Sequence, residues 1–84
     1  MQPDDVTKLI ETAMPDAQVT VNSDGSHYEI LVVSSAFEGL SRLRREQQIN
    51  ALLADAITSG VIHAVSNRLY TPMEWDKASK LQVS

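Results

Sequence analysis

The sequence predicts a small two-layer α+β domain in which helices pack on one face of a three-stranded mixed sheet. Two observations lead to this expectation. Apolar residues recur at helical spacing in the first and fourth of six segments, and at strand spacing in the second, third and fifth. A short polar turn joins the first two strands, whereas a long helix separates the second strand from the third. The first pair is therefore a hairpin and the second a crossover, which makes the sheet mixed.

The first segment, residues 3–14, is an amphipathic helix by its spacing. Asp4 or Asp5 can cap its amino end, where a carboxylate also suits the helix dipole. Pro15 disfavours helical geometry at the residue before it and ends the helix. The apolar stripe expected to face the core consists of Val6, Leu9, Ile10, Ala13 and Met14.

Three segments have the character of strands. Residues 17–22 alternate between apolar and polar, which is typical of a half-buried strand. After a polar turn with Gly25, residues 27–34 contain an apolar run that indicates a central strand. Phe37 is expected to anchor the loop that follows, and residues 61–69 form the third strand.

One long helix is expected between the second and third strands. Ser41 can cap its amino end, and Gly60 is placed to terminate it after about residue 58. Its predicted apolar face consists of Leu43, Ile49, Leu52, Leu53, Ala56 and Ile57.

The last helix, ending near Leu81, has the sharpest local signal. Thr71 at the N-cap and Glu74 three residues later match a capping box, with a proline between them at the first helical position. Tyr70 and Trp75 are spaced for a hydrophobic staple across the same helix start.

Composition and motifs exclude several classes of protein. Among 84 residues with a formal net charge of −4 there is no cysteine, which excludes a disulfide scaffold, a cysteine nucleophile and a cysteine-ligated metal site. No GxSxG, GxGxxG or Walker motif occurs, so we expect no enzyme and no catalytic residue. No apolar run is long enough to span a membrane. We therefore expect a single soluble domain over residues 1–84, in the cytoplasm and without membrane contact.

The chain's two histidines, His27 and His63, are the candidate metal ligands. An imidazole can bind a metal or carry a proton near neutral pH. The alternative for each is a histidine that only hydrogen-bonds a neighbouring residue. Two histidines cannot complete a tetrahedral site without carboxylates or a partner.

Four arginines form a candidate surface for an acidic partner or a nucleic acid. Three of them, Arg42, Arg44 and Arg45, fall in the first turn of the long helix, where cations oppose the helix dipole. Arg68 lies in the third strand. The alternative is an exposed charged face without a partner, and on either interpretation replacing Arg44 and Arg45 should leave the fold intact or stabilise it slightly.

Together these segments resemble the BolA family, and most closely its IbaG-like bacterial branch. The resemblance covers nearly the whole chain in order. The matching stretches are residues 24–28, 30–34, 37–42, 62–66 and 71–75.

The resemblance implies a class II KH-like fold in the order α-β-β-α-α-β-α, with an extra short helix near residues 55–59. It also implies a monothiol glutaredoxin of the CGFS type as partner. The two proteins would share a [2Fe–2S] cluster, with thiolates supplied by the glutaredoxin and glutathione. His63, in its Ile-His-Ala context, matches the family's ligand, and His27 is a second candidate. The isolated chain would hold no cluster of its own.

Some family members are described as transcriptional regulators, and the resemblance therefore keeps a second function open. In that alternative the KH-like fold and the arginines bind DNA as part of a stress response. Residues 38–41 contain one glycine and so lack the GXXG clamp of KH domains. A homodimer also stays open as an oligomeric state.

Overall fold

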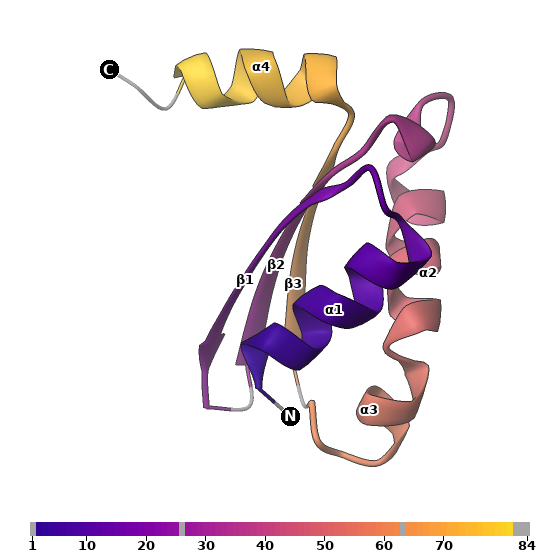
Figure 1. The fold of residues 1–84 in the computed structure, drawn as a ribbon, viewed down its shortest axis with the longest axis vertical. Helices are drawn as coiled ribbons and strands as arrows, with labels where there is room; N and C mark the ends of the chain where they lie inside the picture. The colour runs from indigo at the N-terminus through magenta and orange to yellow at the C-terminus, as the bar shows by residue number, and fades with distance from the viewer. Residues whose placement is uncertain (1, 26, 63, 82–84) are drawn as a thin grey trace.

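The computed structural model describes residues 2–25, 27–62 and 64–81, and it confirms the α+β class with a three-stranded mixed sheet (Figure 1). The expected order α-β-β-α-α-β-α is found, with a short 3-10 helix after the second strand. The elements are α1 (Pro3–Ala13), β1 (Gln18–Asp24), β2 (His27–Val33), η1 (Ser35–Phe37), α2 (Arg42–Leu52), α3 (Ala54–Thr58), β3 (Ala64–Tyr70) and α4 (Pro72–Leu81).

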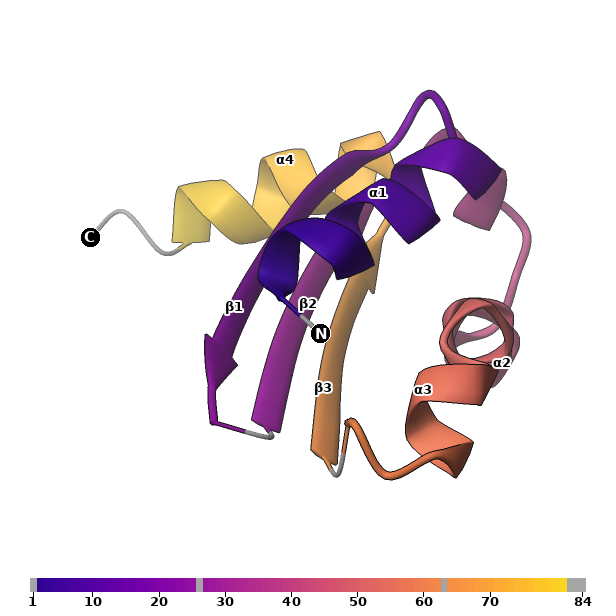
Figure 2. The same cartoon turned by 60° about the horizontal axis from the view of Figure 1, so that its bottom comes forward.

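The sheet has the strand order β1-β2-β3, so β2 is central, as its apolar run predicts. β1 pairs antiparallel with β2, from Gln18 opposite Val33 to Asp24 opposite His27. β3 pairs parallel with β2, and it forms one free edge of the sheet (Figure 2). Gly25, with φ +66°, provides the left-handed residue of the tight turn between β1 and β2.

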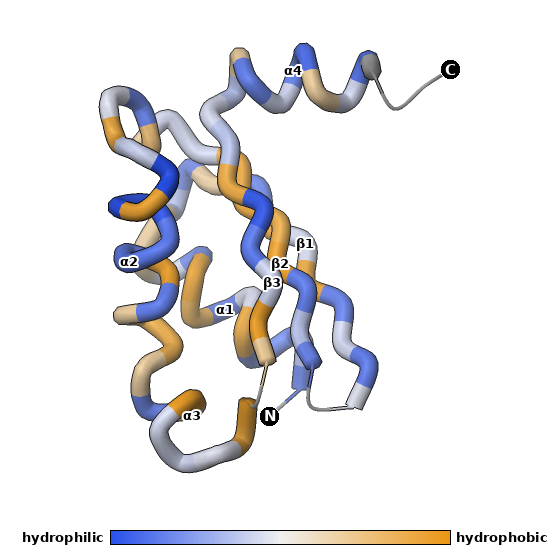
Figure 3. The backbone as a smooth tube through the Cα atoms, turned by 180° about the vertical axis from the view of Figure 1, so that it is seen from behind, coloured by the Kyte–Doolittle hydropathy of each residue, from blue (hydrophilic) through white to orange (hydrophobic). Residues whose placement is uncertain are grey.

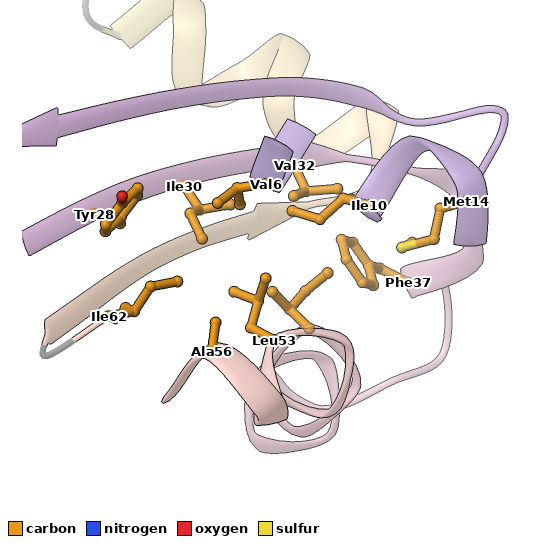
Figure 4. Packing of buried hydrophobic residues seen from close by; sticks show 11 residues of the cluster. Val6, Ile10, Met14, Tyr28, Ile30, Val32, Phe37, Leu53, Ala56 and Ile62 are labelled. Carbon is orange, nitrogen blue, oxygen red and sulfur yellow. The ribbon is translucent and has the colours of Figure 1, made fainter. Parts of the chain in front are cut away.

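Three helices cover one face of the sheet. In Figure 1 the sheet is seen nearly edge-on, with α1, α2 and α3 on one side, while α4 runs from the end of β3 toward the other side. Figure 3 shows hydrophobic residues, coloured orange, along α1, β2 and α3. The buried cluster between the layers consists of Val6, Ile10, Met14, Tyr28, Ile30, Val32, Phe37, Ile49, Leu53, Ala56 and Ile62 (Figure 4).

α1 follows the expected stripe only in part. Val6, Ile10 and Met14 are buried, but Leu9 stays 42% exposed because it lies on the flank of the helix. The N-cap is Gln2, and neither predicted aspartate takes that position. Asp5 instead lies at N3, where its carboxylate accepts the Gln2 backbone N–H at 2.9 Å.

The long helix that the spacing predicts to residue 58 is broken at Leu53, so α2 and α3 are separate. α3 corresponds to the extra short helix that the family resemblance implies. The Leu53 N–H donates to the Asn50 carbonyl at 3.1 Å, a tight i to i−3 bond that ends α2. Leu53 is 1% exposed, and the turn brings both it and Ala56 onto the core. Leu43, predicted on the apolar face, is instead 63% exposed.

β3 begins later than predicted, at Ala64 and not at residue 61. The backbone N–H groups of Val61 and Ile62 both donate to the Ala56 carbonyl, at 3.1 and 3.2 Å. These bonds hold both residues against the end of α3, so they cannot pair with β2. Ile62 is still buried, whereas Val61 is 46% exposed.

A polar contact joins the start of β1 to the end of β2. Ser35 Oγ donates to the Asp16 carboxylate at 2.8 Å, and Ser34 Oγ donates to it at 3.3 Å. The bond from Ser35 is the largest cause that lowers the pKa of Asp16. Ser34 Oγ also accepts the Ala36 N–H and so caps η1, which places Phe37 fully inside the core.

α4 begins with the predicted capping box. Thr71 Oγ1 accepts the Glu74 N–H at 3.2 Å, and the Glu74 carboxylate accepts the Thr71 N–H at 2.9 Å. The Tyr70 and Trp75 rings lie 5.4 Å apart, as the staple predicts. Within residues 2–25, 27–62 and 64–81, no helix is both long and apolar enough to cross a bilayer.

Replacing Thr71 with Ala should destabilise the fold by about 0.5–2 kcal/mol, because the Glu74 N–H loses its capping acceptor. Urea unfolding followed by circular dichroism measures the change. Thr12→Ala is the matched control, because Thr12 is exposed within α1 and should change stability by less than about 0.5 kcal/mol. Equal midpoints for Thr71→Ala and the parent would contradict the capping role.

Candidate functional site

Of the two candidate metal ligands, only His27 belongs to the described residues. His63 lies outside the described residues. His27 opens β2 on the sheet face opposite to Tyr28, and it is exposed. Its Nε2 lies 3.0 Å from Ser66 Oγ on the neighbouring strand. Ala64, which follows His63 in the sequence, is the register partner of His27.

The arginines are only partly brought together. Arg42, Arg45 and Arg68 line one cavity of about 400 Å³ between the start of α2, the end of β3 and the start of α4. Arg44 is exposed on α2 and does not line it. Three of the four arginines predicted to form one surface therefore line a cavity, and the fourth lies outside it.

Arg45 is an internal tether, which corrects its predicted place on an open surface. Its side chain is only 12% exposed. It donates to the Leu40 carbonyl at 3.0 Å and to the Leu69 carbonyl at 3.2 Å. It also forms a two-pronged ion pair with Glu74, and its guanidinium lies 5.8 Å from the centre of the Phe37 ring. Arg45 therefore joins the loop before α2, the end of β3 and the start of α4.

Glu74 has a second role that its place in a capping box does not reveal. The hydrogen bond from Arg45 and the bond from the Thr71 N–H lower the pKa of Glu74 from 4.5 to about 2. The same carboxylate therefore holds α4 by its cap and by its ion pair. Sequence spacing indicates only the cap, because the ion pair joins residues 29 positions apart.

The remaining charges of the cavity are balanced in part. Arg42 lies 3.5 Å from Glu46, and its side chain is 89% exposed. The Arg68 guanidinium lies 5.9 Å from the centre of the Tyr70 ring. No acidic partner for Arg68 is found among the described residues. The cavity is therefore basic only where Arg42 and Arg68 face solvent.

A second cavity, of about 490 Å³, lies between α2, α3 and β3. Asn67 lines both cavities and donates from Nδ2 to Asn50 Oδ1 at 3.2 Å. Its own Oδ1 is shielded from solvent and has no hydrogen-bond partner among the described residues. The sequence does not mark Asn67, because a polar residue in an alternating strand is expected to face solvent.

The described residues contain no group of three or more His, Cys, Asp or Glu side chains placed to hold a metal ion. The chain also has no cysteine anywhere. The chain can therefore offer imidazole nitrogen to iron but no thiolate, and the thiolates of a cluster would have to come from another molecule.

Comparisons with known proteins agree with this architecture. The family model described as BolA-like protein matches residues 5–74. The chain belongs to the BolA family. It is 35% identical over 81 residues to the acid stress protein IbaG of Escherichia coli K12, covering 96% of each chain. That similarity supports the IbaG-like bacterial branch of the family.

Solved structures of BolA-family proteins superpose on this chain. A BolA homologue from Coxiella burnetii gives a TM-score of 0.77 at 32% identity, with 90% of this chain and 97% of that chain covered. The BolA domain of SufE1 from Arabidopsis thaliana also gives 0.77, at 27% identity, with 86% and 93% covered. The helix and strand order described above is therefore that of the BolA family.

The sequence alone predicts that the fold tolerates replacement of Arg45, but its observed contacts lead to a different prediction. Replacing Arg45 with Gln should cost about 1.5–3 kcal/mol, because two backbone carbonyls and a carboxylate lose a charged donor. Arg44→Gln is the matched control in the same helical turn. It should change stability by less than about 0.5 kcal/mol, since Arg44 makes no contact of this kind with the described part of the chain. Equal urea midpoints for the two variants would show that the tether contributes nothing.

Acid should weaken the fold through Glu74. The folded-state pKa is about 2, below the ordinary value of 4.5, so ionised Glu74 contributes stability that is complete above pH 4.5. That contribution is lost as the pH falls toward 2. We expect the difference in urea midpoint between the parent and Glu74→Gln to shrink over this range. A difference that is independent of pH would contradict the ion pair.

Proposed function

We propose that this BolA-family chain is an accessory protein in iron–sulfur cluster assembly, trafficking or iron homeostasis. It would form a heterodimer with a monothiol CGFS glutaredoxin, bridged by a [2Fe–2S] cluster that is its cargo. The observation that carries the proposal is family membership over nearly the full chain, with His63 in the matching Ile-His-Ala context.

The donor chemistry of the chain supports a shared cluster. Clusters of this class are held mainly by thiolates, and histidine replaces some of them in known centres. This chain has two imidazoles and no thiolate. The glutaredoxin and glutathione would supply the sulfur ligands, and His63 would supply one nitrogen ligand.

His27 is proposed as a neighbouring group with a smaller role. Its register partner is Ala64, the residue that follows His63 in the sequence. Its Nε2 lies beside the Ser66 hydroxyl, and that contact would have to break before this nitrogen could bind iron.

Protonation should matter for this chemistry. A protonated imidazole cannot coordinate a metal, and imidazoles titrate near neutral pH. Cluster ligation through His63 would therefore weaken in mild acid. The name of the E. coli relative associates that protein with acid stress, which is consistent with a response of this kind.

DNA binding is the weaker candidate. Phosphate binding needs a focused basic surface. Of the four arginines, Arg45 is bound internally and Arg44 lies outside the cavity. Glu46 and Glu74 line the cavity together with the other two. Only Arg42 and Arg68 remain to face a phosphate there.

His63→Ala should lose or alter the visible spectrum of the heterodimer. The measurement reconstitutes the chain with a CGFS glutaredoxin, glutathione, iron and sulfide, and then records absorbance of the purified complex. Circular dichroism should stay native, which separates loss of a ligand from loss of the fold.

His27→Ala is the matched control, and its effect should be smaller. The same spectra recorded at falling pH should show the parent losing its cluster faster than a complex with only thiolate ligands. An unaltered spectrum and cluster lifetime in His63→Ala would overturn the assignment of His63 as a ligand.

A further inference from the structure

We propose that a groove along the free edge of β3 binds an extended peptide segment of a partner protein, which adds a strand and places an acidic side chain beside Arg42 and Arg68. We call this feature the β3 groove. It consists of the two cavities that share Glu46 and Asn67. The proposal involves no metal and is independent of the proposed cluster function.

The backbone of β3 supplies the first argument. The Tyr70 carbonyl accepts the Ser34 N–H from the strand end beside it, so the groups of Tyr70 point toward β2. Alternate residues of a strand direct their backbone groups to opposite sides. Val65, Asn67 and Leu69 therefore point to the free edge. Of these, only the Leu69 carbonyl has a partner in the described structure, which is Arg45.

An unpaired edge of this kind is a template for another strand. α2 and α3 run beside this edge of β3 (Figures 2 and 3), and the two cavities lie between them and the strand. The groove therefore offers backbone hydrogen bonds on its floor and helix side chains on its wall. An extended peptide uses both features, whereas a docked helix would leave the edge groups unpaired.

Asn67 supplies the second argument. Its Oδ1 is shielded from solvent without a partner, at the point where the two cavities meet. A buried acceptor without a donor is costly. A peptide N–H lying along β3 would satisfy it.

The two ends of the groove differ in character, which defines the occupant. Ile57, which is 39% exposed, and Val65 line the α3 end and give it an apolar surface. Arg42 and Arg68 lie at the other end, and Arg45 is already neutralised by Glu74. The fitting segment is thus apolar at one end and acidic at the other.

A nucleic acid fits the same groove poorly. Glu46 lines both cavities and Glu74 lines one, so a phosphate backbone would pass two carboxylates. A peptide can direct its neutral backbone past Glu46 and its acidic side chain toward the arginines.

The test pans a display library of short linear random peptides against the complete, cluster-free chain. Enriched peptides should be extended, with an acidic residue near one end. N-methylation of one backbone amide at a time should weaken binding about tenfold or more at every second position, since alternate amides face the edge. Hydrogen exchange at the Val65 and Asn67 amides should slow on binding.

Two pairs of variants locate the site. Arg68→Glu should weaken the enriched peptides about tenfold, whereas Arg44→Glu should not, because Arg44 lies outside the groove. Ile57→Glu should also weaken them. Leu9→Glu is its control, since Leu9 is equally exposed but lies on α1.

Several outcomes would overturn the proposal. These are enrichment of no peptide, a helical period in the N-methyl scan, or binding that is unaffected by both groove variants. Displacement of the peptides by single-stranded DNA, or concentration-dependent dimers that bury the β3 edge, would assign the groove to another occupant. None of these results depends on a cluster, so they leave the glutaredoxin proposal to its own test.

Discussion

Arg45 connects the loop before α2 to the end of β3 and the start of α4, where its partners lie 24 and 29 positions away in the sequence. Its guanidinium binds the carbonyls of Leu40 and Leu69 and the carboxylate of Glu74. The first lies before α2, the second near the end of β3, and the third in the first turn of α4. An arginine suits this position because its planar group has several donors in a fixed fork. This one side chain therefore links the end of β3 and the start of α4 to the loop before α2, in addition to the pairing of β3 with β2.

This role explains the local electrostatics of α2. Cations in a first turn oppose the helix dipole, so three arginines there are unfavourable for the isolated helix. Arg45 is compensated by Glu74, and Arg42 lies near Glu46. Arg44 has no such compensation among the described residues. Within the basic run, Arg45 therefore has a structural role, whereas Arg42 and Arg44 are exposed at the surface.

The elements that local chemistry governs were predictable from the sequence. The capping box at Thr71, the staple of Tyr70 with Trp75, and the central place of β2 all depend on neighbouring residues. The spacing of the long helix did not indicate the break at Leu53, which only the family resemblance implied through its extra short helix near residues 55–59. The late start of β3 was not predicted, because it depends on the bonds of Val61 and Ile62 to the Ala56 carbonyl. The site shows the same division. The basic run of arginines is visible in the sequence. That Arg45 is bound internally while Arg42 and Arg44 stay exposed is not, because it depends on Glu74, 29 positions away.

The two neighbours of β2 become available at different times during synthesis. β1 precedes β2 directly and can pair with it at once, but β3 follows only after α2 and α3, with His27 opposite Ala64 in the register. Until then one edge of a strand that contains Ile30, Leu31, Val32 and Val33 is unpaired. Such a segment is prone to intermolecular strand pairing. The parallel crossover thus makes the nascent chain vulnerable to aggregation over the interval in which α2 and α3 are made, until β3 pairs with this edge.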